Sequence, residues 1–178
     1  CDWRDGRVVA SIVNNGKRND LMMRLDIVSG AQQISFLPDI LTLRKSVWPA
    51  FIRVPDEKIT QFYTLFPDFQ FSLFEDKKLV AIFNTLPLFF NQALTALPDT
   101  GVSWAIETAL TTKTKFNNLL CATSMTVSPD FRNQGISKLF LNHAKTIGKE
   151  RGLSHIVAAV RPNLKCAYPL IPIEEYLT

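Results

Sequence analysis

Cysteine and histidine are both scarce in this chain of 178 residues. The three cysteines, Cys1, Cys121 and Cys166, lie far apart, which argues against a disulfide framework and favours reduced thiols in a cytoplasmic protein. The two histidines, His143 and His155, form no cluster with zinc-ligand spacing. We therefore expect no metal site.

No apolar run is long enough to cross a lipid bilayer, and neither sign of charge is in large excess. The longest apolar stretch, residues 79–90, is interrupted by Asn84, Thr85 and Pro87. The net charge of +4 is mildly basic. This charge is compatible with binding an anionic small molecule, but it is spread too evenly along the sequence to indicate a nucleic-acid-binding protein. We expect neither a membrane nor a nucleic acid as a partner.

Glycine is less frequent than proline, with seven glycines against ten prolines. Proline interrupts helices and central strands, so this composition excludes a long helical bundle or a coiled coil. The hydrophobic fraction of 47% and the charged fraction of 20% are typical of a folded globular chain. The length is close to the roughly 150 residues of one domain. We expect a single domain over residues 1–178, with residues 1–30 as an N-terminal hairpin or extension.

Hydrophobic periodicity divides the chain into short strands and helices. Strands are expected over residues 8–13, 21–28, 69–73, 79–86, 119–127 and 155–160. Helices are expected to begin near residues 36–39, at Pro55 and at Ser103, and residues 87–101 are expected to form a loop. The clearest helix covers residues 135–151. Its apolar side chains form one stripe that predicts a buried face: Ile136, Leu139, Phe140, Ala144 and Ile147.

The most informative part of the sequence is the strand–loop–helix–strand unit over residues 119–160. The first turn of a helix carries unpaired backbone N–H groups and the positive end of the helix dipole, which together can hold an anion. Here Gly135 and Ser137 keep that turn narrow, and Arg132 adds a positive charge just before it. These features predict a diphosphate-type site over residues 133–138. The alternative is an ordinary strand–helix connection that begins with small and polar residues.

Arg132, Gly135 and Ser137 follow a strand that is stopped by Pro129, and their spacing resembles a known motif. It is similar to the acyl-CoA motif Arg/Gln-x-x-Gly-x-Gly/Ala of the GCN5-related N-acetyltransferase (GNAT) family, with Ser137 in place of the last small residue. The resemblance implies an α/β (α+β) fold with a mixed, mostly antiparallel central sheet flanked by helices. The order of elements expected over residues 34–160 agrees with that fold.

The resemblance also implies how coenzyme A would bind. Backbone groups of the motif strand would hold the pantetheine arm, and by position this role falls to Met125 and Val127. The diphosphate would lie against the loop and the start of the helix, beside Arg132. By position this second role falls to Asn133, Gln134, Gly135, Ile136, Ser137 and Lys138.

Acyl transfer from a thioester to an amine needs a neutral amine, a polarised carbonyl and a protonated leaving thiolate. The resemblance implies a tyrosine as the acid, and Tyr168 is the candidate because it follows the strand expected at residues 155–160. The alternative is that Tyr168 simply packs. Glu107, the only carboxylate in an apolar helical segment, is a candidate base if burial raises its pKa. The alternative is an exposed charge at a helix edge.

The resemblance therefore implies an acyl-CoA-dependent N-acyltransferase that moves an acetyl or other acyl group directly from CoA to an unidentified amine. Acetyl-CoA would be the cosubstrate. The alternative is a non-catalytic acyl-CoA-binding or regulatory module of a larger protein. The family usually continues with another helix and two strands at a point where this chain has only residues 161–178. We expect those C-terminal strands to be truncated, supplied by a partner or absent, and a homodimer stays open.

Overall fold

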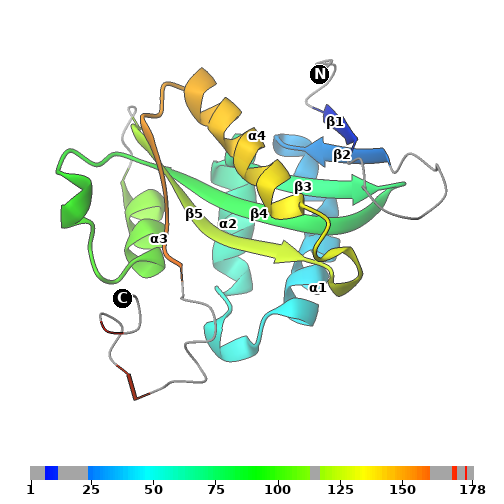
Figure 1. Cartoon of the computed structure of the whole chain (residues 1–178), viewed down its shortest axis with the longest axis horizontal. Coiled ribbons are helices and arrows are strands. Elements are labelled where there is room, and N and C mark those ends of the chain that lie inside the picture. The colour runs from blue at the N-terminus through cyan, green and yellow to red at the C-terminus, as the bar shows by residue number, and fades with distance from the viewer. Residues whose placement is uncertain (1–6, 12–23, 113–116, 161–169, 172–174, 176–178) are drawn as a thin grey trace.

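The structure, a computed structural model, describes residues 7–11, 24–112, 117–160, 170–171 and 175 of the chain. Its centre is a six-stranded sheet in which the strands lie in chain order (Figure 1). The strands are β1 (Arg7–Ser11), β2 (Arg24–Val28), β3 (Gln70–Glu75), β4 (Lys78–Leu88), β5 (Leu119–Val127) and β6 (His155–Ala158). All neighbouring strands are antiparallel except β5 and β6, which are parallel. The mostly antiparallel sheet expected from the sequence is confirmed.

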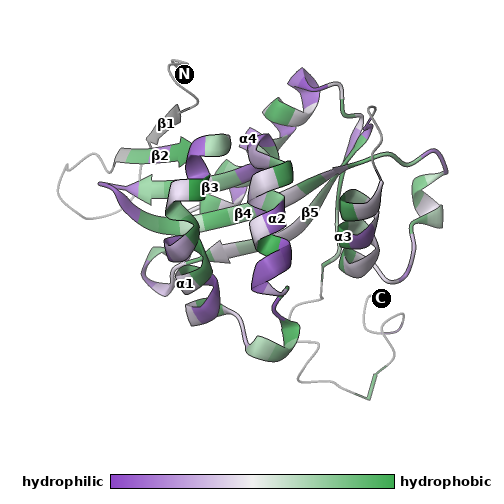
Figure 2. Ribbon diagram, turned by 180° about the vertical axis from the view of Figure 1, so that it is seen from behind, coloured by the Kyte–Doolittle hydropathy of each residue, from purple (hydrophilic) through white to green (hydrophobic). Residues whose placement is uncertain are grey.

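Helices cover both faces of this sheet. In the described ranges the α-helices are α1 (Leu37–Val47), α2 (Asp56–Leu65), α3 (Val102–Thr111) and α4 (Ile136–Glu150). Figures 1 and 2 show α4 on one face and α1, α2 and α3 on the other. The single α4 and the three other helices therefore each cover one apolar face of the strands.

The predicted stripe of α4 is the buried face of that helix. Phe140 is fully buried, and its ring centroid lies 5.7 Å from that of Phe83 on β4. Full burial of a phenylalanine side chain stabilises a fold by about 2 kcal/mol. On the opposite face of the sheet, Phe62 of α2 packs in a second apolar cluster with Ile82 and Leu119. These two clusters fix the sheet between its helix layers.

Strand β4 extends through Pro87 to Leu88, so the expectation that a loop begins at residue 87 is wrong. Proline removes a backbone donor and is tolerated where a strand has one neighbour. The pairing of β3 with β4 ends at Gln70↔Asn84, whereas β4 continues to pair with β5 as far as Leu88↔Leu119. Pro87 therefore lies where β5 is the only paired neighbour of β4.

The other boundaries differ less from expectation. β1 and β2 pair antiparallel, and the residues expected to form the turn between them lie outside the described residues. The short helix expected at residues 103–107 is the ten-residue α3, and β6 ends at Ala158, before residue 160. The element order expected from the sequence is otherwise the order observed.

Candidate functional site

The edge of β5 that faces β6 is open over half of its length. The two strands pair from Leu119↔His155 to Ala122↔Ala158, and β6 ends there while β5 continues to Val127. Within the described residues, positions 123–127 therefore have β4 as their only neighbouring strand. Backbone N–H and C=O groups on such an edge can pair with an extended ligand.

A β-bulge marks the point where this open edge begins. The register between β4 and β5 passes from Asn84↔Ser124 to Thr85↔Ala122, so Thr123 is the extra residue. The Thr123 hydroxyl donates a hydrogen bond to the backbone oxygen of Asn84 over 3.0 Å. A bulge bends its strand and increases the local twist. The bend thus coincides with the separation of β5 from β6.

The N-terminus of α4 follows β5 directly and is open to a ligand. Gly135 is the N-cap in the left-handed conformation, with φ of 77°, and no side chain caps the helix. The first helical bond runs from the Leu139 N–H to the Gly135 oxygen. The N–H groups of residues 136–138 are therefore left without helical partners, and no acidic residue lies in the first turn. This terminus has the properties of an anion site.

The side chains around this terminus divide into exposed and buried groups. The exposed residues are Arg132, Asn133, Gly135, Ser137 and Lys138. Ile136 is only 2% exposed and packs in the core beneath α4, so the backbone N–H is what it can offer to a ligand. Gln134 is half-buried, and its Oε1 atom is buried without a hydrogen-bond partner among the described residues. A ligand donor at the loop could satisfy that oxygen.

Met125 and Val127 lie on the open half of β5, as their predicted role requires. Both side chains are half-buried and pack against the core cluster that includes α4. Contacts with an extended ligand at these two positions would therefore come from backbone atoms.

The two catalytic candidates are not brought together by the described residues. Tyr168 lies outside them. Glu107 is exposed on α3, which supports the alternative of a charge at a helix edge. Cys121 is buried in β5, where desolvation raises its thiol pKa to about 11. This thiol stays protonated at neutral pH and is a poor nucleophile.

A buried polar network that the sequence analysis missed lies beneath the bulge. We call Tyr63, Gln70, Asn84 and Ser124 the Asn84 network. Asn84 Nδ2 donates to the Tyr63 hydroxyl and to Gln70 Oε1, each over 3.0 Å. The Ser124 hydroxyl donates to Asn84 Oδ1 over 3.1 Å. The network ties α2, β3 and β4 to the open half of β5. In the sequence, the one indication of this network was Asn84, a polar residue within an apolar run.

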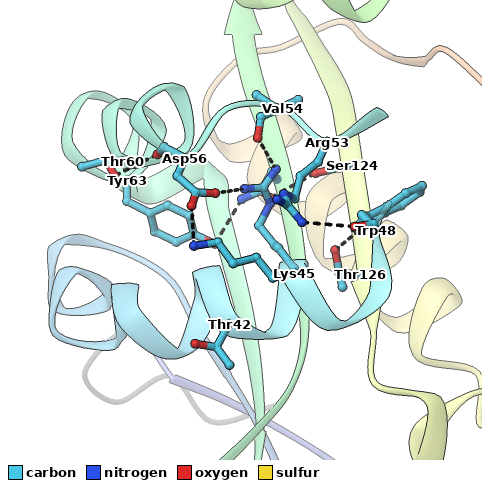
Figure 3. Close-up of polar contacts among 12 residues, drawn as sticks. Thr42, Lys45, Trp48, Arg53, Val54, Asp56, Thr60, Tyr63, Ser124 and Thr126 are labelled. Carbon is cyan, nitrogen blue, oxygen red and sulfur yellow. Dashed lines mark hydrogen bonds and ion pairs between the residues drawn. The ribbon is translucent and has the colours of Figure 1, made fainter. Parts of the chain in front are cut away.

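A second polar group joins the α1–α2 connection to β5 (Figure 3). The buried Arg44 donates to the Val54 oxygen over 2.9 Å and lies 3.5 Å from Asp56, which also pairs with Lys45 over 2.8 Å. The Trp48 indole N–H donates to the Thr126 hydroxyl over 2.8 Å. The end of α1 is thereby fastened to the strand that carries the open edge.

These environments also decide which groups can exchange protons. Burial raises the pKa of Tyr63 to about 12, although hydrogen bonds from Asn84 and Ser72 oppose the rise. The hydrogen bond from Lys45 is the main cause that lowers the pKa of Asp56. At neutral pH Tyr63 therefore keeps its proton, and the lowered pKa of Asp56 makes its carboxylate a weak proton acceptor. Neither is suited to act as a general base.

Comparison with known proteins identifies the family. The sequence model of the acetyltransferase (GNAT) family matches residues 39–170, and the chain belongs to this family. A curated relative, the arginine N-acetyltransferase avaD of Aspergillus versicolor, is 26% identical over 147 residues. That alignment covers 74% of this chain and 50% of the relative, so the chain spans about half the length of the curated relative it matches.

Solved structures share the fold at low sequence identity. The loading GNATL domain of CurA from Lyngbya majuscula superposes with a TM-score of 0.70 at 17% identity, covering 83% of this chain and 70% of that one. The GphF GNAT-like decarboxylase in complex with isobutyryl-CoA gives 0.69 at 18% identity, covering 84% and 74%. The aminoglycoside N-acetyltransferase AAC(6')-Iy in complex with CoA gives 0.55 at 15% identity, covering 86% and 88%. These likenesses confirm the GNAT fold.

The described residues contain neither a metal-binding cluster nor a membrane-spanning helix. Within the described ranges, no group of three or more His, Cys, Asp or Glu side chains is arranged to hold a metal ion. None of the helices in those ranges combines the length and the hydrophobicity needed to cross a bilayer.

Proposed function

We propose that this chain binds acetyl-CoA or another acyl-CoA and transfers the acyl group directly to an amine. One observation carries the proposal. The open backbone edge of β5, residues 123–127, leads within a few residues to the uncapped N-terminus of α4. An extended amide-bearing arm joined to a diphosphate matches this arrangement, and pantetheine diphosphate has that form.

The proposed binding mode divides the cofactor between the two elements. The pantetheine arm pairs with backbone groups of β5 near Met125 and Val127. The diphosphate accepts hydrogen bonds from the N–H groups of residues 136–138, while Arg132 and Lys138 add positive charge. The thioester then lies toward the bulge at Thr123, where β5 and β6 separate.

Transfer proceeds by direct attack in a ternary complex. The neutral amine attacks the thioester carbonyl, and a backbone N–H on the open edge of β5 stabilises the oxyanion of the tetrahedral intermediate. The carbon–sulfur bond then breaks, and the CoA thiolate takes a proton while the new amide nitrogen loses one. We assign the proton donor to Tyr168 from its resemblance to the family acid. Water accepts the proton from the amine, because the pairing of Asp56 with Lys45 and Arg44 lowers the pKa of that carboxylate and makes it a weak base.

The choice of a first acceptor to test rests only on the name of the curated relative. Because avaD is named an arginine N-acetyltransferase, L-arginine is the first amine to test as an acceptor. A cytoplasmic location, as expected from reduced thiols, would give the protein access to both acetyl-CoA and free amino acids.

The proposal is tested by two measurements on the wild-type chain. Calorimetric titration with acetyl-CoA should show binding at micromolar ligand, and absence of heat at high micromolar ligand would contradict the proposed cofactor. Release of free CoA thiol should then depend on added amine. Binding of acetyl-CoA without thiol release for any amine would support the non-catalytic acyl-CoA-binding module instead.

A further inference from the structure

The direction of every hydrogen bond in the Asn84 network can be derived from two backbone carbonyl groups. Gln70 Nε2 donates to the Phe66 oxygen over 3.1 Å and to the Thr85 oxygen over 2.8 Å. Carbonyl oxygens only accept, so the amide nitrogen of Gln70 must face them. Gln70 Oε1 is therefore an acceptor, and the group that meets it, Asn84 Nδ2, must be a donor.

The donor-to-acceptor direction of these bonds also decides which group Ser124 offers at the surface of the site. With Asn84 Nδ2 donating to Gln70 and to Tyr63, Asn84 Oδ1 faces Ser124 and accepts the proton of its hydroxyl. The one proton of Ser124 is thus directed into the protein, and the lone pairs of its oxygen remain available. Ser124 is half-buried beside the bulge. At this point the site offers a hydrogen-bond acceptor and cannot offer a donor.

Arg53 offers hydrogen-bond donors and a positive charge on the same side of β5. Its Nη1 atom donates to the Trp48 oxygen over 3.3 Å, and the Trp48 indole is itself bonded to Thr126 over 2.8 Å. Thr126 and Ser124 lie two residues apart on one strand, so they share a face. Figure 3 shows a dashed line from Arg53 to Trp48 and another from Trp48 to Thr126. Two hydrogen bonds in series therefore link this guanidinium to Thr126 on the open half of β5.

Arg53 has no ion-pair partner among the described carboxylates. The acidic group in its neighbourhood is Asp56, and that carboxylate pairs with Lys45 over 2.8 Å and with Arg44 over 3.5 Å. Arg53 is half-buried rather than fully solvated. A positioned, partly desolvated guanidinium with free donors is suited to bind a carboxylate.

We propose that the acceptor is an amine that also carries a carboxylate, as an α-amino acid does. Arg53 binds the carboxylate, and Ser124 Oγ accepts one N–H of the amine and turns the nitrogen lone pair toward the thioester. This assignment rests on the proposed acyl transfer and specifies its substrate class. Ser124 takes no proton in the reaction, because it serves only as a hydrogen-bond acceptor.

Pairs of matched acceptors test the contact of Arg53 with the carboxylate separately from the contact of Ser124 with the amine. Thiol release is measured with L-arginine against L-argininamide and with L-leucine against L-leucinamide. Each KM is expressed as the concentration of neutral amine, because the amide also lowers the pKa of the α-amine. Wild type should use the acids with a KM at least ~10-fold lower than the amides, the size of one charge-assisted hydrogen bond. Arg53→Gln should raise the KM of the acids about 10-fold and leave that of the amides unchanged. Arg53→Lys should restore part of the difference.

Ser124→Ala should have a different signature. It removes the acceptor for the amine, so kcat/KM should fall about 10-fold for acids and amides alike, and Ser124→Thr should recover activity. Lys58→Gln is the charge control, because Lys58 is an exposed lysine of α2. This variant should leave every KM unchanged if a specific contact, rather than net charge, selects the acid.

The outcomes distinguish this inference from the proposed function. Absence of acetyl-CoA binding would overturn the proposed function itself. Amine-dependent thiol release with amides used as well as acids, or an unchanged acid-to-amide KM ratio in Arg53→Gln, would overturn the substrate class alone. If no acceptor in the panel turns over, calorimetry of the acids with the CoA-bound protein decides, since wild type must bind them more tightly than Arg53→Gln.

Discussion

Gly135 combines a backbone conformation and an open surface that together fit a ligand site. Its φ of 77° lies in the left-handed region, and a side chain there would meet no atom within 4 Å. A larger residue would therefore not disturb the core, but it would add bulk at the N-cap position of α4, next to the proposed diphosphate site. The cost of the left-handed conformation for a non-glycine residue is about 1–2 kcal/mol.

Gly135→Val should weaken acetyl-CoA binding at least ~10-fold, because one lost charge-assisted contact is worth that much. Gly152→Val is a matched control at the other end of α4, where φ is 72° and no atom lies within 4 Å either. Both variants should lose similar stability. Calorimetric titration should show weaker binding for Gly135→Val alone, and equal affinities in the two variants would contradict the assigned site.

Tyr168 is the candidate proton donor to the leaving thiolate. If it has this role, Tyr168→Phe should lower kcat by about 100-fold, the contribution of one acid–base group, with little change in acetyl-CoA affinity. Tyr176→Phe is the control for removal of another tyrosine hydroxyl. The measurement is steady-state thiol release with the best amine, and an unchanged kcat in Tyr168→Phe would remove the assignment.

Among the elements, the α1–α2 connection depends on one ion pair. Arg44 is 2% exposed, and Asp56 is the carboxylate that pairs with it. Its Nε atom has no hydrogen-bond partner in the part of the chain that the structure describes. Removing one member of such a pair leaves a buried charge without compensation. Because this connection also carries Trp48 and Arg53, its stability affects the open side of β5.

Asp56→Asn should lower the free energy of unfolding by about 2 kcal/mol, less than the ~3 or more for a fully buried pair because Asp56 is partly exposed. Glu57→Gln is the control, since it also removes a carboxylate from the first turn of α2 but Glu57 is exposed. Urea denaturation gives both values. Equal losses for the two variants would show that the helix dipole, rather than the Arg44 pair, explains the effect.

The elements themselves could largely be predicted from the sequence, whereas their side-chain network could not. The stripe on α4 was predictable because one helix needs only its own periodicity. The passage of β4 through Pro87 was not, because it depends on where β3 stops pairing. Asn84 joins Tyr63, 21 residues away, and Ser124, 40 residues away. Contacts at such separations follow from the register of the sheet and leave no local pattern.

For the whole molecule, one buried histidine links folding to pH. His143 on α4 is 8% exposed, and its ring lies edge-on to Phe71 with centroids 5.0 Å apart. Its Nε2 atom has no hydrogen-bond partner within the described ranges. Burial lowers its pKa below the usual 6.5. The folded state therefore disfavours protonation of this ring, while the unfolded chain binds the proton normally.

The free energy of unfolding should fall as the pH drops below about 6.5, because the unfolded state then binds a proton that the folded state resists. The loss continues until the pH reaches the lower pKa of the folded protein. His143→Phe removes this group and should flatten the dependence between about pH 7 and pH 5. His155→Gln, at an exposed position on β6, is the control for replacement of a histidine. An unchanged slope in His143→Phe would assign the pH effect to other groups.

A crystal structure of the chain with acetyl-CoA would show where the cofactor lies. Its diphosphate oxygens should lie within about 2.7–3.2 Å of the backbone nitrogens of residues 136–138. The pantetheine arm should pair with residues 123–127 of β5. An ordered cofactor bound elsewhere, or a diphosphate without bonds to the start of α4, would contradict the proposed binding mode.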